Sequence, residues 1–358
     1  MTAAASGVPG RVPVRVGPIS GVWRPRSMLV TTVAAVVLLA ATAANVALGE
    51  FPMSIGEVLA VLTGGGSGGQ RFIVLELRLP RALTGALVGA ALGVAGAILQ
   101  TITRNPLASP DVLGVMTGAG AAALLVIVLG SWGATPGWAA AVGLPLAAVC
   151  GGLVSAVLLY ALAWRQGVSG FRLVLVGIGL NLVFTAVIQW LLIAGDVHEA
   201  ARAAVWLNGS LNARGWEHVV PVAVALAVLV PLALVLIFQL DALHLGDDIA
   251  VGLGVRVNGA RAALLAVSVA LAAVATAAAG PIAFVALVAP QIALRLVHGS
   301  RPPVVAGMVL GAALTVTADL VARTAFGGAE LPVGIVTAAL GAPYLLFLLV
   351  RHRREVRV

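Results

Sequence analysis

The stretch that decides the fold runs from Arg78 to Gly118 and reads RLPRALTGALVGAALGVAGAILQTITRNPLASPDVLGVMTG. Its middle part, residues 82–101, carries no charge. About twenty apolar residues suffice to cross a bilayer core of about 30 Å at about 1.5 Å per residue. Gly85, Gly89 and Gly93 recur every fourth residue, so they share one helix face. The pattern predicts a membrane helix that packs closely against a neighbour.

A sharp turn follows this helix. Pro106 and Pro110 lie four residues apart and cannot continue a helix. A second apolar run begins directly after them, so the sequence predicts a helical hairpin. Its turn carries Arg104 and Asn105.

Composition places the whole chain in a membrane. The 358 residues are 61% hydrophobic and 9% charged, with a mean hydropathy of +1.11. These proportions indicate a polytopic membrane protein, in which an excess of arginine reports topology rather than nucleic-acid binding. All 21 basic residues are arginine. Without lysine there is no P-loop and no Schiff base, so ATP that drives this chain must be hydrolysed by another subunit.

The sequence shows no residue pattern typical of a catalytic or metal site. Cys150 is the single cysteine, which excludes a disulfide framework, and the five histidines are scattered. We therefore expect no catalytic residue, no cofactor and no metal site.

Hydropathy predicts an all-α protein of ten transmembrane helices. A disordered tail (1–27) precedes a retained first span that is too long for a signal peptide. The spans form a domain over residues 28–350, followed by a short tail (351–358). The predicted spans are 28–48, 79–101, 112–130, 138–162, 173–194, 217–240, 259–279, 282–297, 303–321 and 332–350.

Arginine counting orients the bundle. With the N-terminus in the cytosol, the inside segments hold about fifteen arginines and the outside segments about six, as the positive-inside rule requires. An even number of spans puts both termini in the cytosol. This orientation places the turn at Asn105 inside and Arg78, Arg81 and Arg323 outside.

One cytosolic loop stands apart from the others. Residues 241–258 read DALHLGDDIAVGLGVRVN, with two carboxylates near a predicted helix start. Four apolar residues are predicted to share a face, namely Leu243, Leu245, Ile249 and Leu253. The pattern favours a short helix presented to a soluble partner over a solvated connector.

Three further patterns interrupt the apolar spans. Gly280-Pro281 and Ala289-Pro290 predict a short, irregular span, which is tolerated only where protein or a water-filled cavity covers it. Thr315, Asp319 and Arg323 share one helix face, and we expect an Asp319–Arg323 pair, structural or functional. A polar stripe of Asn181, Thr185 and Gln189 is either inter-helix hydrogen bonding or the wall of a transport pathway.

Five motifs, in this order, resemble the permease subunits of type II ABC importers, the FecCD family, which import iron-siderophores, haem and cobalamin. They are RLPR (78–81), NPLASPDVLG (105–114), LGDDIAVGLG (245–254), GPIAFVALVAPQIALR (280–295) and ELPVGIVTAALGAP (330–343). The resemblance covers roughly residues 28–350. It implies the type II ABC importer permease fold in the bacterial cytoplasmic membrane. It also implies a second permease subunit, identical or paralogous, two cytosolic ATPase subunits and an extracytoplasmic substrate-binding protein.

The resemblance also implies roles for individual residues. Arg78, Arg81 and Arg323 match external arginines that receive acidic residues of the binding protein, a task suited to guanidinium forks. Asn105 and Leu107 match a cytosolic gate. The predicted ATPase-coupling residues are Leu245, Gly246, Asp247, Asp248, Ala250, Leu253 and Gly254.

Two positions depart from the family pattern. The loop Val168-Ser169-Gly170 occupies the place of a second gate, with Ser169 as its gate residue, and the loop lacks the second hydroxyl-bearing residue that some members carry. Where many members read Pro-His, this chain reads Pro290-Gln291, which keeps a donor and loses titration.

The motif WLNGSL (206–211) resembles the version common in siderophore permeases. This resemblance implies a ferric siderophore as cargo, and a cobalamin or haem permease is the alternative within the family. An ion-coupled carrier would need acids along the pathway, and only Asp319 comes near. A membrane enzyme would need a cluster of acidic metal ligands, whereas Asp247-Asp248 stands alone in a loop.

Overall fold

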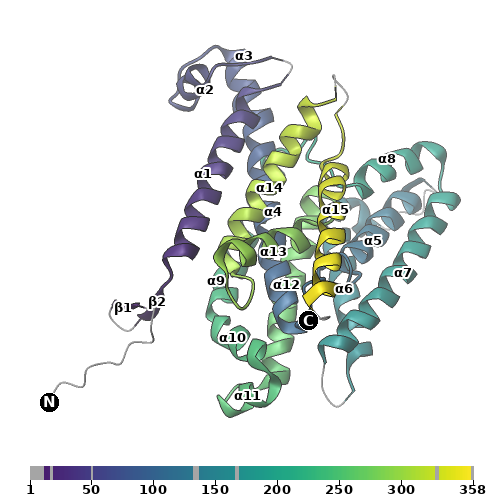
Figure 1. Ribbon diagram of the computed structural model, residues 1–358. Coiled ribbons are helices and arrows are strands. Elements are labelled where there is room, and N and C mark those ends of the chain that lie inside the picture. Colours follow the sequence, from purple (N-terminus) through teal and green to yellow (C-terminus); the bar gives the residue numbers. More distant parts are fainter. Residues whose placement is uncertain are drawn as a thin grey trace.

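The computed structural model describes residues 12–16, 19–49, 51–131, 137–165, 169–326 and 330–355. They form a bundle of roughly aligned helices (Figure 1). Seven described helices are long and apolar enough to cross a membrane, and three apolar helices are shorter. These ten coincide with the predicted spans: α1 Pro25–Ala47, α4 Leu79–Thr103, α5 Val115–Ser131, α6 Gly137–Ala163, α7 Gly170–Ala194, α9 Trp216–Val235, α12 Val257–Ala279, α13 Val285–Val297, α14 Val304–Thr324 and α15 Val333–Glu355.

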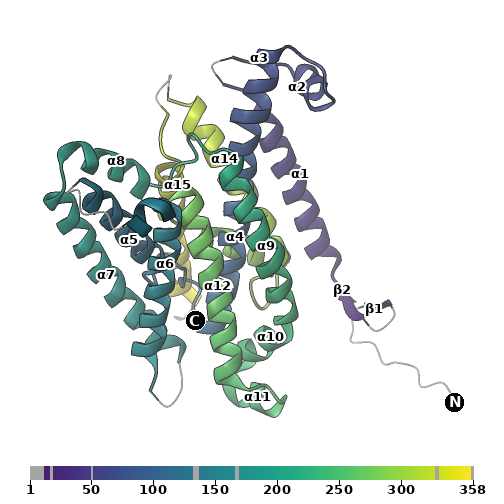
Figure 2. The ribbon, with the colours of Figure 1, turned by 180° about the vertical axis from the view of Figure 1, so that it is seen from behind.

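Helix α4 is the core of the bundle. It is buried over most of its length and contacts α1, α9, α12, α13 and α14. Figures 1 and 2 show it surrounded from both sides. The glycine face packs on α14, because a Cβ at Gly89 would overlap the carbonyl of Gly311, and one at Gly93 that of Gly307. The predicted close packing is thereby confirmed, with α14 as the partner.

The segment before α4 is more helical than expected. After a short helix α2 (Ile55–Leu62), the chain enters α3 (Gly68–Arg71) and a π-helical stretch η1 (Phe72–Arg78), which continues directly into α4. The continuous helix thus begins at Gly68 rather than near residue 79. Pro80 lacks an N–H and would break regular α-helical hydrogen bonding. The wider π-helical turns just before it accommodate this missing donor.

Within the segment predicted as a disordered tail (1–27), the described residues form two strands and the start of α1. Strands β1 (Val12–Val16) and β2 (Ile19–Trp23) pair as an antiparallel hairpin, with Val14 opposite Gly21. Alternating β-branched residues favour such pairing. Helix α1 then begins at Pro25, a residue suited to the first helical turn.

The irregular span predicted near residue 282 is confirmed. Helix α12 ends at Gly280 (φ 73°), and Phe284 is left-handed (φ 67°) before the short helix α13, which contains Pro290. The loop after α8 (Val197–Leu207) covers this break, since Ser210 N–H donates to the carbonyl of Ala279 at 2.7 Å. Protein therefore supplies hydrogen-bond partners to the backbone groups at this break, which lipid could not do.

The loop predicted at 241–258, together with the last residues of the predicted span before it, forms two helices, α10 (Ile237–Leu245) and α11 (Asp247–Gly252). Gly246 (φ 125°) separates them, in a conformation that glycine adopts most readily. Figures 1 and 2 both place α11 at one end of the bundle and α2 and α3 at the other. We call these the α11 end and the α2 end.

Candidate functional site

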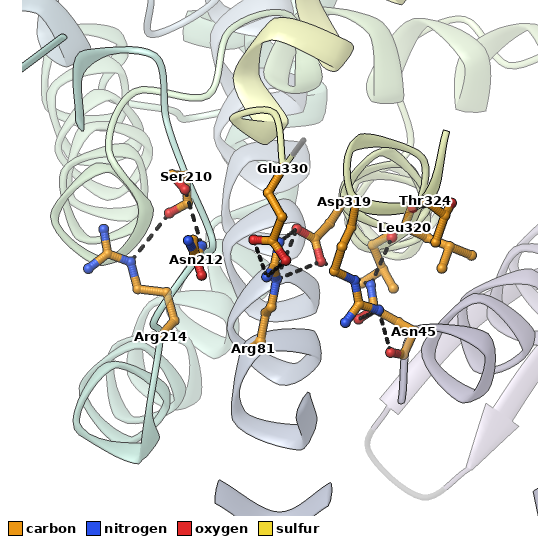
Figure 3. Close-up of polar contacts among 11 residues, drawn as sticks. Asn45, Arg81, Ser210, Asn212, Arg214, Asp319, Leu320, Thr324 and Glu330 are labelled. Atoms are coloured by element: carbon orange, nitrogen blue, oxygen red, sulfur yellow. Dashed lines mark hydrogen bonds and ion pairs between the residues drawn. The ribbon is translucent and has the colours of Figure 1, made fainter. Parts of the chain in front are cut away.

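A buried ionic cluster lies toward the α2 end (Figure 3). Arg81 on α4 grips Asp319 on α14 with two arms of its guanidinium group. Its Nε lies 3.2 Å from both carboxylate oxygens, and its Nη2 lies 2.9 Å from Oδ1. The third nitrogen, Nη1, lies 3.1 Å from Oε2 of Glu330. A single guanidinium thus joins α4, α14 and the segment that leads into α15.

The predicted pair between Asp319 and Arg323 is wrong. Among the described residues Arg323 turns instead to α1, where its Nη2 donates to the carbonyl of Asn45 at 2.6 Å and to its side-chain Oδ1 at 3.1 Å. Asn45 Nδ2 in turn donates to Asp319 Oδ2 at 3.0 Å. The planar fork of Arg81 offers the buried carboxylate a bidentate partner, which a neighbour one helical turn away does not match.

Arg78 has a different environment from the other two predicted docking arginines. It is 6% exposed and donates to the carbonyls of Val46, Ala47 and Phe51 at 2.9, 3.1 and 2.8 Å. These carbonyls lie at and just beyond the end of α1, where backbone acceptors lack helical partners and the helix dipole favours a cation. Arg78 therefore caps α1. Docking by all three arginines stays a prediction.

The sequence patterns did not predict two members of this cluster. Asn45 is fully buried, and Glu330 opens the motif at 330–343, in which no residue role was predicted. The signal for Asn45 was present, because it is the sole amide side chain in an otherwise apolar first span. Nearby, Arg214 donates from Nε to the carbonyl of Ser210 at 3.3 Å. Burial lowers the pKa of Arg214, and the Glu217 carboxylate opposes that shift.

A second ionic cluster lies at the α11 end. Arg104, the left-handed residue that ends α4, places Nη2 2.5 Å from Oδ1 of Asp247 and Nε 3.1 Å from the carbonyl of Leu243. Arg261 on α12 reaches the same Asp247 oxygen at 2.9 Å. The first residue of α11 is therefore tied both to the turn after α4 and to α12. The turn and the loop were both predicted, whereas the contact between them was not.

The predicted apolar face of the 241–258 loop needs one correction. Leu243 is fully buried rather than presented, because the break at Gly246 interrupts the helical period. Val251 joins the exposed residues in its place. We call the resulting patch the coupling surface; its members are Leu245, Ile249, Val251 and Leu253, each 50–63% exposed. Ala250, which was predicted to couple, is buried beneath it.

The predicted gate residues lie near one another at the ends of two helices. Asn105 Oδ1 accepts from Leu107 N–H at 2.9 Å, which rigidifies the turn after α4. Ser169 caps α7, since its hydroxyl accepts from the N–H and Nε of Arg172. A Cβ at Gly170 would lie 2.7 Å from the carbonyl of Thr103, so these ends touch. Val168 lies outside the described residues.

The polar stripe on α7 is only partly enclosed. Thr185 donates to the carbonyl of Asn181 at 2.7 Å, within its own helix. Asn181 is half-buried and Gln189 is exposed. Both predicted roles, inter-helix bonding and pathway wall, stay predictions.

Gln291, at the position where many family members carry histidine, belongs to the core. It donates to Gln100 Oε1 at 2.7 Å, and Gln100 donates to the carbonyl of Leu287 at 3.0 Å. Both amides are buried, so this chain of hydrogen bonds fixes α13 against α4.

Comparison with known proteins agrees with this architecture. The chain is 40% identical to the ferric enterobactin transport system permease protein FepG of Escherichia coli, over 86% of this chain and 91% of that protein. It is 42% identical to the achromobactin transport system permease protein CbrC of Dickeya dadantii, over 93% of this chain and 97% of that protein.

The fold has a counterpart among solved structures. An inward-facing structure described as a metal-chelate type ABC transporter superposes with a TM-score of 0.76 at 26% identity, covering 90% of this chain and 99% of the other. Residues 37–351 match the FecCD transport family. On this match and on the relatives that align over most of its length, the chain belongs to the FecCD transport family.

Proposed function

We propose that this chain is the permease subunit of an ATP-binding-cassette importer that moves a ferric siderophore across the cytoplasmic membrane. The observation that carries the proposal is 40–42% identity, over most of the chain, to permeases named for ferric enterobactin and achromobactin. The chain performs no chemistry on its cargo. It alternates between states open to either side of the membrane, and the energy comes from partner subunits.

The coupling surface supports an ATPase partner. It gathers four exposed apolar side chains on and beside a short helix that projects from the α11 end. Exposed apolar residues in this setting favour a protein interface over contact with water. We assign the α11 end and both termini to the cytosol, and the α2 end to the outside, where a substrate-binding protein docks.

The contacts at the α11 end support a route from the motor to the gate. A push on α11 acts on Asp247, whose carboxylate holds Arg104 at the end of α4. Asn105 and Leu107 follow directly, and Ser169 caps α7, whose first residue Gly170 lies against Thr103 at the end of α4. We propose that movement of α11 repositions these gate residues. A second permease subunit completes the pathway, with the α7 stripe as part of its wall.

The test is transport in proteoliposomes that contain the permease, its ATPase and its binding protein. We expect uptake of radiolabelled ferric siderophore to require ATP inside and the binding protein outside. Haem and cobalamin serve as competing cargoes, and uptake of either one alone would overturn the siderophore assignment. Uptake that persists without the ATPase and collapses with an uncoupler would instead identify an ion-coupled carrier.

A further inference from the structure

The two carboxylates that contact Arg81 differ in accessibility. The Asp319 side chain is 2% exposed and takes both Nε and Nη2, whereas the Glu330 side chain is 40% exposed and takes only Nη1. Breaking the contact between Arg81 and Asp319 would leave an unpaired charge in a buried site, so that contact is retained. Water competes with the contact between Arg81 and Glu330, which is therefore weak and replaceable.

Glu330 lies where an incoming carboxylate would have to bind. The Arg81 side chain is itself only 10% exposed, and Nη1 is the arm directed to the more open partner. Arg81 and Arg323 bring two positive charges to this cluster, and Asp319 and Glu330 bring two negative charges. Replacing Glu330 with a carboxylate from another protein would keep this balance and release Glu330 to water.

We infer that Glu330 is an internal stand-in for an acidic residue of the substrate-binding protein. It holds Nη1 of Arg81 in the free permease, and an aspartate or glutamate of the docking protein displaces it. This inference rests on the proposed function and deepens it. Docking becomes an exchange of carboxylates at one guanidinium rather than the filling of an open site.

The backbone around Glu330 permits the exchange without unfolding. Leu331 N–H donates to the carbonyl of Ala322 at 3.2 Å, and Gly334 N–H donates to the carbonyl of Gly209 at 3.1 Å. These bonds hold the segment in place on both α14 and the 208–215 loop. Rotation of the Glu330 side chain alone can therefore free Arg81.

The test compares Glu330→Gln with Glu76→Gln in nanodiscs that hold the assembled transporter. Both changes remove one negative charge from the α2 end, and Glu76 is exposed and lies on the helix that carries Arg81. We expect Glu330→Gln to tighten binding of the binding protein about threefold, the scale of an exposed ion pair. Glu76→Gln should change it by less than about 1.5-fold. Affinity that falls, or that matches the control, overturns the inference.

A second background isolates the role of Arg81. Arg81→Gln combined with Asp319→Asn removes the guanidinium without leaving a buried carboxylate unpaired. In that background Glu330→Gln should no longer raise affinity, and a persisting gain would overturn the exchange. Failure of the wild-type transporter to bind the protein at all would instead overturn the proposed function. The two failures are thereby distinguishable.

Discussion

Arg104 and Asp247 join the turn after α4 to the first residue of α11, with Nη2 and Oδ1 2.5 Å apart. Their side chains are 44% and 49% exposed, so the pair contributes little to stability, at most about 1 kcal/mol. The Arg104–Asp247 pair matters because of where it lies. It connects the helix that carries the coupling surface with the turn that carries the predicted gate residues Asn105 and Leu107.

Replacing Asp247 with asparagine should therefore separate ATP hydrolysis from transport. We expect ATPase binding and hydrolysis to persist while cargo moved per ATP falls several-fold, because α11 is no longer tied to Arg104. Asp196→Asn is the control, since Asp196 is exposed, makes no side-chain cap hydrogen bond and lies outside the 241–258 loop. The measurement is uptake and hydrolysis in the same proteoliposomes. Equal cargo per ATP in the two variants would contradict this link.

Arg78 gives the second prediction, which separates its contact with the end of α1 from its predicted role in docking. Arg78→Gln removes a cation from three backbone carbonyls, and hydrogen bonds to charged groups are worth about 1.5–3 kcal/mol each. We expect a clear fall in the thermal unfolding midpoint in detergent. Binding-protein affinity of the folded fraction is measured alongside, because docking by Arg78 is also predicted. A variant that unfolds like wild type but binds weakly would contradict the capping role and favour docking alone.

Local periodicity explains which parts of the structure were predictable. Hydropathy alone placed all ten apolar helices, because each must satisfy its backbone within the membrane. The glycine face of α4 predicted a close neighbour, but its identity as α14 depends on tertiary packing. Asp319 shows the limit most clearly. Sequence spacing favoured Arg323 four residues away, whereas the observed partner, Arg81, is 238 residues distant.

In the candidate sites, too, local patterns were predictable and contacts across the fold were not. The loop at 241–258 was identified from its composition, and the exposed residues of its coupling surface largely match the prediction. Leu243 was placed on the exposed face in error, because a break at Gly246 interrupts the helical period. Asn45 and Glu330 gain their importance only from contacts across the fold. A single sequence does not carry that information.

The coupling surface provides the third prediction. Leu253→Asp places a charge within the apolar patch, which desolvation at an interface strongly disfavours. We expect the ATPase to be lost on co-purification, while the permease itself remains folded because Leu253 is 50% exposed. Asn258→Asp adds the same charge to an exposed position at the end of the loop and should leave the complex intact. Equal ATPase yield from both variants would exclude this surface.

The packing of α4 on α14 gives the last prediction. Gly93→Ala should destabilise the bundle, because the new Cβ meets the backbone of Gly307 and Met308, which has no side-chain freedom with which to yield. Overpacking of this kind costs about 1–3 kcal/mol. Gly179→Ala is the matched control on α7, since a Cβ there has no heavy atom within 4 Å. Because alanine favours a helix over glycine by about 0.8–1 kcal/mol, that control should be neutral or stabilising. Thermal unfolding in detergent measures both variants. Equal midpoints would mean that α4 and α14 can separate without loss, against the close approach of their glycine faces.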